Sequence, residues 1–324
     1  MAYRTLPPEE ISRRISNLQN LLEDKGFQGA LIIQKVDLYY LSGTDQDAHL
    51  WVPRSGPPLL MVRKSMERAL EDAPLEHIVP LSGFSQIPRL IEEHDGGNPD
   101  TIGLEMDVLP VNMFRGYQRL FPDADMIDVS PLIRQLRMRK SPYELDILRR
   151  AADLADQLLQ RIPDFIRESE TDTDLVLRAE AFYRSQGHPG LSRMRSFNME
   201  TLYGHLIAGP SGARPSATPG PTAGTGPGPF LSQGTAMKRL IPHTPILVDY
   251  TANVEGYLSD QTRIFSIDTL SEKLHRAHGV MIEAQEAMAR EGKPGVVAKD
   301  LYAIALGIVE KAGLMEGFMG HPQP

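Results

Sequence analysis

The stretch that decides the fold is Ile246-Leu-Val-Asp-Tyr-Thr-Ala-Asn-Val-Glu-Gly-Tyr-Leu-Ser-Asp-Gln-Thr-Arg-Ile-Phe265. Two strand-like segments lie on either side of Asn253-Val-Glu-Gly256 in this stretch. Asn and Gly accept the backbone conformations that tight turns need, so the pattern predicts a β-hairpin.

Two acids occupy matching positions on the arms of this hairpin. If the hairpin is symmetric about the Val254–Glu255 bond, Asp249 lies directly opposite Asp260 on the same face. Carboxylates so placed repel each other unless they share a cation or a proton. Asp oxygens suit hard or borderline divalent metals, so the spacing predicts half of a metal site. The alternative is that one Asp is a turn residue and the other a solvated residue at a strand end.

The residues around the two acids form a longer motif. Asp-x10-Asp ends in Gly-Tyr-x-x-Asp-x-Thr-Arg here, and this resembles the first half of the metal site in "pita-bread" metallopeptidases. That family includes Xaa-Pro aminopeptidases, prolidases, methionine aminopeptidases and the metal-free relative creatinase. The resemblance implies that Asp249 chelates one ion and that Asp260 bridges two. Thr262 shares a strand face with Asp260, so its hydroxyl is expected to support the ligands from behind.

The family pattern adds three further ligands, a His in a Gly-rich His-Gly segment and two Glu. The chain ends in Gly317-Phe-Met-Gly-His-Pro-Gln-Pro324, where His321 is followed by Pro, so we interpret His321 as a loop residue. The sequence therefore carries two of five expected ligands. We expect it to lack the C-terminal part of the second domain and to be inactive by itself.

Composition limits the class of protein. The net charge is −8, which argues against a nucleic-acid partner and an anionic membrane surface. There is no Cys, so disulfides, thiolate zinc sites and a Cys nucleophile are excluded. The N-terminus has no apolar signal core, and the longest apolar runs are too short to span a bilayer. We expect a cytoplasmic protein.

Strand and helix patterns alternate in the first part of the chain, which predicts an α/β domain over residues 1–137. The expected strands are Ala30–Ile33, Asp37–Gly43, Leu59–Val62, His77–Val79, Thr101–Leu104 and Met126–Val129. The opening helix followed by Gly-x-x-Gly-Ala-Leu-Ile-Ile resembles the N-terminal domain of creatinases and Xaa-Pro peptidases. The fold class is thus α/β, a creatinase-like domain followed by an incomplete pita-bread α+β domain over residues 138–324.

Helix signals follow this boundary. Ser141 is a good N-cap and Glu144 completes a capping box, so a helix is predicted from Pro142. Further helices are predicted over Asp172–Ser185, Ser271–Glu291 and Val297–Ala312.

The segment from Gly209 to Gly234 is about half Gly and Pro, a composition that excludes a regular helix or a central strand. It is either a flexible surface loop or a wall of the substrate cleft. Relatives commonly carry Pro-His at about Pro215-Ser216, and their His contacts substrate, so Ser216 departs from the family pattern. His205 is a candidate substitute for substrate binding, although a strand histidine without such a role is the simpler interpretation.

The resemblance implies a metal-dependent aminopeptidase or dipeptidase of the Xaa-Pro type that uses two divalent ions, Mn²⁺, Co²⁺ or Zn²⁺. The expected partners are a peptide substrate and a second copy of the chain in a homodimer. Two alternatives stay open. One is a creatinase-like, metal-free amidinohydrolase, against which the retained acids argue, and the other is a non-catalytic binding or dimerisation protein.

Overall fold

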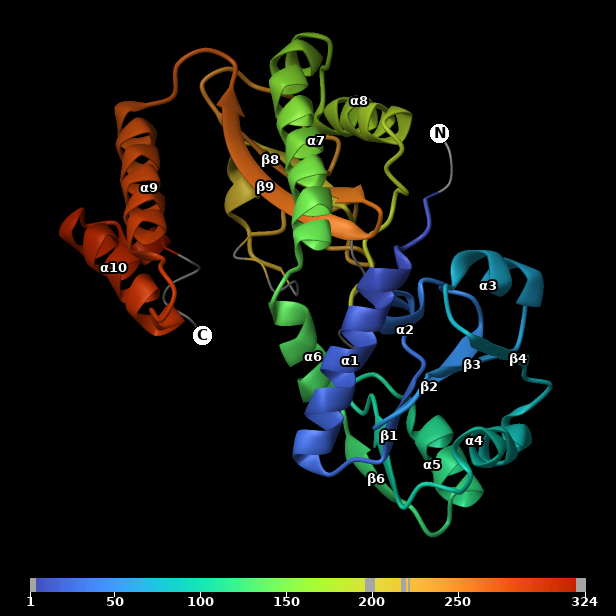
Figure 1. The fold of residues 1–324 in the computed structure, drawn as a ribbon. Coiled ribbons are helices and arrows are strands. Elements are labelled where there is room, and N and C mark those ends of the chain that lie inside the picture. The colour runs from blue at the N-terminus through green and yellow to red at the C-terminus, as the bar shows by residue number, and fades with distance from the viewer. Residues whose placement is uncertain (1–3, 196–201, 217–219, 221, 319–324) are drawn as a thin grey trace. The chain divides into compact units, whose positions relative to one another are not determined.

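The computed structural model describes residues 4–195, 202–216, 220 and 222–318, and its ribbon is drawn in Figure 1. The chain divides into two compact units. The first comprises Met1–Leu145 with Arg193–Met199, and the second comprises Asp146–Ser192 with Glu200–Pro324. The division between the two units falls inside a helix, between Leu145 and Asp146. The domain boundary expected after residue 137 stays a prediction.

The first unit is built on a mixed sheet with the strand order β4-β3-β2-β1-β5-β6. Its strands are β1 (Gly29–Ile32), β2 (Ala48–Pro53), β3 (Leu59–Val62), β4 (His77–Pro80), β5 (Thr101–Leu104) and β6 (Asp125–Asp128). β1, β5 and β6 run parallel, β3 and β4 run parallel, and β2 is antiparallel to both of its neighbours. Five of the six expected strands are confirmed, while β2 went unpredicted.

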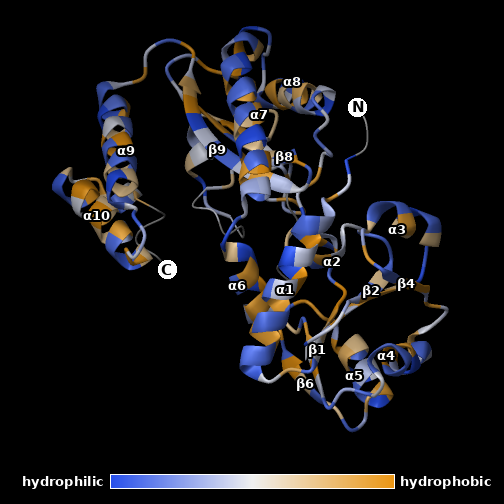
Figure 2. Cartoon of the chain, in the orientation of Figure 1, coloured by the Kyte–Doolittle hydropathy of each residue, from blue (hydrophilic) through white to orange (hydrophobic). Residues whose placement is uncertain are grey.

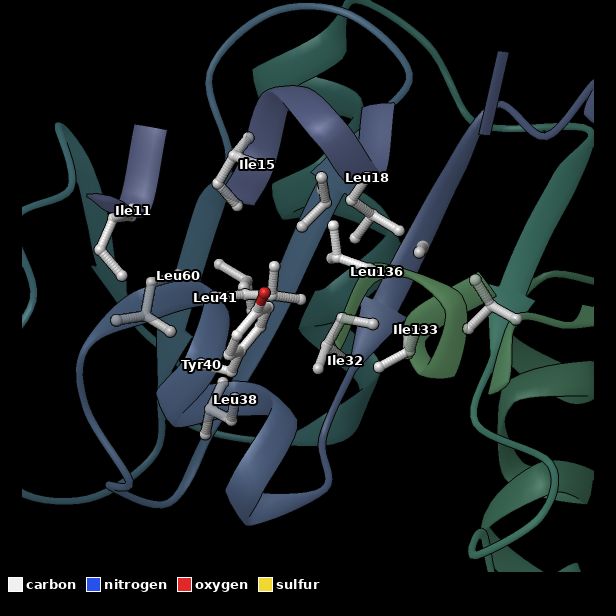
Figure 3. Close-up of a cluster of buried hydrophobic side chains, with 14 of the residues drawn as sticks. Ile11, Ile15, Leu18, Ile32, Leu38, Tyr40, Leu41, Leu60, Ile133 and Leu136 are labelled. Atoms are coloured by element: carbon white, nitrogen blue, oxygen red, sulfur yellow. The ribbon is translucent and has the colours of Figure 1, made fainter. Parts of the chain in front are cut away.

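Helices cover both faces of this sheet. They are α1 (Pro8–Lys25), α2 (Lys35–Ser42), α3 (Met66–Asp72), α4 (Ile87–Asp95), α5 (Val111–Leu120) and α6 (Ser130–Met138), with a 3-10 turn η1 (Phe84–Gln86). On one face, side chains of α1, α2 and α6 pack against Ile32 and Leu60, as Figure 3 shows. On the other face, Leu31 and Trp51 pack with residues of α4 and α5. The α/β fold class is confirmed.

The strand predicted over Asp37–Gly43 is wrong, because the segment forms helix α2. The Gln34 side chain caps this helix by accepting hydrogen bonds from the N–H groups of Val36 and Asp37. Gly43 ends it in a left-handed conformation with φ of 86°. A short apolar run does not distinguish strand from helix, and here the capping residues decided the outcome.

The second unit is α+β. Helix α7 (Pro142–Arg167) belongs to this unit from Asp146 onward. It starts at the predicted capping box, in which Glu144 N–H donates to Ser141 Oγ at 3.1 Å and Ser141 N–H donates to Glu144 Oε2 at 2.8 Å. Helix α8 (Asp172–Ser185) follows. Both helices pack on one face of an antiparallel sheet with the order β7-β8-β9. The strands are β7 (Gly204–Ala208), β8 (Pro245–Val254) and β9 (Tyr257–Ser266).

Two more helices end the described part of the second unit. α9 (Glu272–Glu291) and α10 (Ala298–Lys311) lie within the predicted ranges, and a short 3-10 turn η3 (Met315–Gly317) follows them. The two helices pack mainly on each other. Across the described residues, none of the helices combines the length and the apolar character that crossing a bilayer requires.

Candidate metal site on the open face of the second sheet

The hairpin forms as predicted, but its register differs from the predicted one. β8 and β9 pair around a two-residue turn, Glu255-Gly256, with Val254 opposite Tyr257. Asp249 therefore faces Thr262, and Asp260 faces Thr251, so the direct Asp249–Asp260 pairing is wrong. The turn residues explain the difference: Glu255 and Gly256 both have positive φ, of 51° and 85°. Such turns match the strand twist and place Gly at the second position, a signal that fixes the register.

The two acids nevertheless share a face of the sheet. Along β8, Val248, Tyr250 and Ala252 are buried against the helices, so Asp249 and Thr251 point to the opposite face. The register puts Thr262 and Asp260 on that same face, which we call the open face. Asp249 and Asp260 are diagonal rather than direct neighbours there, which corresponds to about 7–8 Å between Cα atoms.

Asp249 lies at the centre of a row of polar side chains that crosses all three strands. His205 on β7 and Thr262 on β9 are its direct cross-strand neighbours. Thr262 Oγ1 donates a hydrogen bond to Asp249 Oδ1 at 2.8 Å, and His205 Nε2 lies 3.2 Å from Asp249 Oδ2. Burial alone would raise the pKa of Asp249, but His205 and Thr262 more than offset it, so the pKa lies below its usual value. The carboxylate is thus held ionised.

Asp260 belongs to the next row of the open face. Its Oδ1 accepts a hydrogen bond from Thr251 Oγ1 at 3.1 Å, and the residue is exposed. Thr262, expected beside Asp260, shares its face but bonds to Asp249 instead. Each acid therefore has one threonine hydroxyl that orients it from the facing strand, an arrangement that follows from the register.

The Gly/Pro-rich segment runs beside this sheet. Of its described residues, Gly209–Ala213 form a 3-10 turn (η2) and the others form neither a helix nor a strand, as the composition predicts. η2 packs against β7 and β8. A methyl group built on Gly212 would lie 3.8 Å from Leu247, two residues before Asp249. Ser216 is half-buried and its hydroxyl lies 2.8 Å from that of Ser232.

His205 is the site residue whose surroundings the sequence did not foretell. The sequence makes it a candidate for substrate binding, and the structure places its ring against Asp249. Nε2 is inaccessible to solvent and makes no well-aligned hydrogen bond among the described residues, although Asp249 Oδ2 lies only 3.2 Å away. A buried nitrogen without a partner is costly in a folded protein. Only the pairing of β7 with β8 reveals this contact, since the two residues are distant in the sequence.

The donor chemistry of the open face suits a divalent ion. Two carboxylates and an imidazole are ligands that Mn²⁺, Co²⁺ and Zn²⁺ accept. In the described part of the chain, no group of three or more His, Cys, Asp or Glu side chains is already gathered closely enough to hold an ion. His321, interpreted above as a loop residue, lies outside the described residues.

Known proteins resemble the chain over nearly its whole length. An Xaa-Pro dipeptidase of Pyrococcus furiosus is 22% identical over 316 residues, covering 96% of this chain and 82% of the relative. A probable dipeptidase of Mycobacterium bovis is 25% identical over 337 residues, covering 98% and 80%. Among solved structures, an Xaa-Pro dipeptidase from Bacillus anthracis superposes with a TM-score of 0.79 at 21% identity, covering 94% of this chain and 78% of that one.

Two family models divide the chain between them. Residues 14–139 match the creatinase/prolidase N-terminal domain, and residues 146–322 match metallopeptidase family M24. The second match alone covers more than half of the chain and includes β7, β8 and β9. The chain belongs to metallopeptidase family M24 and carries a creatinase/prolidase N-terminal domain before its peptidase domain.

Proposed function

We propose that this protein is a metal-dependent peptidase of the Xaa-Pro type, which hydrolyses peptide bonds at the N-terminus of short peptides. The observation that carries the proposal is the pair Asp249 and Asp260 on one open sheet face, inside the segment that matches the M24 family. The similarity to Xaa-Pro dipeptidases supports the substrate class.

The roles of the chain's own residues follow from their contacts. Asp249 and Asp260 would hold divalent ions, Mn²⁺, Co²⁺ or Zn²⁺, which when bound supply Lewis acidity for the attack of water on a peptide carbonyl. Thr262 fixes one oxygen of Asp249, and Thr251 fixes one oxygen of Asp260. These hydroxyls restrict the rotation of the carboxylates, so the side chains lose less conformational entropy when they bind an ion.

The test is hydrolysis of Xaa-Pro dipeptides by the protein as its gene encodes it. Metal-dependent release of proline, lost on chelation and restored by Mn²⁺ or Co²⁺, supports the proposal. Asp260→Asn should abolish turnover, whereas Asp156→Asn, an exposed acid on α7, should leave it unchanged. Hydrolysis that survives chelation would favour the metal-free, creatinase-like alternative. An Asp260→Asn enzyme with full activity would show that the acid pair has a structural role only.

We also propose that the protein forms a homodimer, and α9 and α10 favour this. Several large apolar residues of this helix pair and its connection are exposed: Leu274, Ile282, Val296, Val297 and Tyr302. Figure 2 shows apolar residues along both helices. Exposed apolar residues that are grouped together mark association surfaces more often than apolar residues that are scattered singly over a surface. Light scattering coupled to size-exclusion chromatography measures the mass directly, and a monomer at micromolar concentration would refute the proposal.

A further inference from the structure

We propose that His205 is itself a metal ligand, and that its Nε2 and Asp249 Oδ2 bind the same borderline divalent ion. The inference rests on the proposed function, because it adds a ligand to the same open face. It differs from the substrate-binding role considered for His205 in the sequence. It also differs from a purely supporting role, in which the imidazole would only hydrogen-bond to the acid.

The first argument is the distance between the two atoms. Ligand atoms that lie about 2.1 Å from one ion are separated from each other by roughly 3.0–3.4 Å in octahedral or tetrahedral sites. His205 Nε2 and Asp249 Oδ2 are 3.2 Å apart. The pair therefore has the separation of two ligands on one ion before any ion is bound.

The second argument is the direction of the imidazole. Nε2 makes no well-aligned hydrogen bond to Asp249 Oδ2, although the two atoms are only 3.2 Å apart. Nε2 is also shielded from solvent and makes no other hydrogen bond among the described residues, so its hydrogen-bonding capacity is only partly used. An ion beside Oδ2 would satisfy Nε2 without any change in the strand pairing. Buried polar atoms that lack a partner call for this kind of explanation.

The third argument is that the two carboxylate oxygens of Asp249 have different neighbours. Its Oδ1 is engaged by Thr262 at 2.8 Å, which leaves Oδ2 as the oxygen available to an ion, and this is the oxygen beside His205. Strand pairing fixes all three residues in one row across β7, β8 and β9. An imidazole ligand also favours Co²⁺, Zn²⁺ or Mn²⁺ over Mg²⁺ and Ca²⁺, which prefer oxygen.

The experiment is a titration of the 324-residue chain with Co²⁺, followed by visible absorbance and by proton NMR. Coordination through Nε2 leaves a proton on Nδ1, so we expect a hyperfine-shifted, solvent-exchangeable imidazole N–H signal. His205→Asn and His205→Gln should remove this signal and weaken Co²⁺ binding at least tenfold, since even residues that only support a ligand cost about 10–100-fold. The matched control is His275→Asn on the exposed surface of α9, which should change neither quantity.

Several results would overturn the inference. A parent chain that binds no Co²⁺ would do so. A parent chain that binds Co²⁺ without the N–H signal would also do so, even if the affinity falls in the His205 variants. A folded His205→Gln protein, judged by circular dichroism, that keeps both the signal and the affinity would do so too. The proposed function is judged separately by peptide turnover. Metal-dependent turnover together with unchanged Co²⁺ binding in His205→Gln would reject the ligand and leave the peptidase standing.

Discussion

The two sheets of this protein differ in how far their faces are covered by helices. In the six-stranded sheet of the first unit, every residue of β1, β2 and β3 is buried, because helices cover both faces. In the three-stranded sheet of the second unit, β8 alternates between buried and half-buried residues along most of its length. In the second sheet, carboxylates on the central strand lie on a face where they are not fully desolvated, whereas the central strands of the first sheet offer no such position. The comparison locates the candidate chemistry on the less protected sheet.

One buried charged network of the first unit can be compared with the His205 contact of the second. In the first unit, Arg14 is buried with Glu10 and Glu144, at 2.9 Å and 3.7 Å, and Ser141 donates a hydrogen bond to Glu10. On the open face, His205 Nε2 has no hydrogen-bond partner among the described residues. A buried network with its charges paired rigidifies the structure, whereas a buried nitrogen without a well-aligned hydrogen bond keeps a desolvation cost.

The largest expected effect is the loss of the buried cation in the first unit. Arg14→Leu removes the buried guanidinium that pairs with both Glu10 and Glu144, and breaking a buried ion pair in this way costs about 3–5 kcal/mol in the free energy of unfolding. Trp51, the single tryptophan, is fully buried in this unit, so its fluorescence in urea measures the change.

The matched control for that change is Arg89→Leu, which removes an exposed pair with Glu93 and should cost at most about 1 kcal/mol. If the two variants lost equal stability, the buried network would contribute no more than a surface ion pair. The contrast between the two units would then fail at its strongest point.

A second prediction compares apolar residues of the two sheets. Leu50 on β2 is fully buried, so Leu50→Ala should destabilise the first unit by about 2–5 kcal/mol. Leu258 on β9 is 37% exposed, and Leu258→Ala should cost less than about 1 kcal/mol. Trp51 fluorescence reports the first change, and hydrogen exchange of the β8 and β9 amides reports the second. A large loss at Leu258 would mean that the open face is packed after all.

A third prediction uses the pH dependence of the first unit. Burial lowers the pKa of His49 to about 4, and its Nε2 lies 2.8 Å from the Tyr117 hydroxyl. Between pH 6.5 and 4 the unfolded chain binds a proton that the folded chain does not. The contribution of neutral, buried His49 to the free energy of unfolding is therefore fully present above pH 6.5. It is lost as the pH falls toward 4, by about 3 kcal/mol in all.

Urea midpoints measured by Trp51 fluorescence from pH 7 to 4 check this dependence. His49→Gln removes the titrating group, so the variant should lose less stability over that range than the parent. Parallel curves for the two proteins would assign the acid sensitivity to other groups.

The smallest expected effect on stability belongs to the open face. Asp260 is exposed, so Asp260→Asn should change the free energy of unfolding by no more than about 0.5 kcal/mol. The same variant should lose divalent-ion binding, measured by calorimetry on the same preparation. A destabilisation of several kcal/mol would place Asp260 in the structural framework and weaken the contrast drawn between the two sheets.

The sequence by itself determined the local features of this protein. The capping box of Ser141 and Glu144, the helices α9 and α10 and the existence of the hairpin all depend on residues close together in the chain. The period of two along a strand also placed Asp249 and Asp260 on one face, since an even shift in register leaves the face unchanged.

The tertiary structure decided which side chains are neighbours and which segment became a helix. The hairpin turn moved Thr262, not Asp260, opposite Asp249. The caps at Gln34 and Gly43 made a helix where apolar residues suggested a strand. The contact of His205 with Asp249 needed β7 to pair with a strand far along the chain. Sequence periodicity gives the face on which a side chain lies, but its cross-strand neighbour depends on register, which turns and the packing of distant segments fix together.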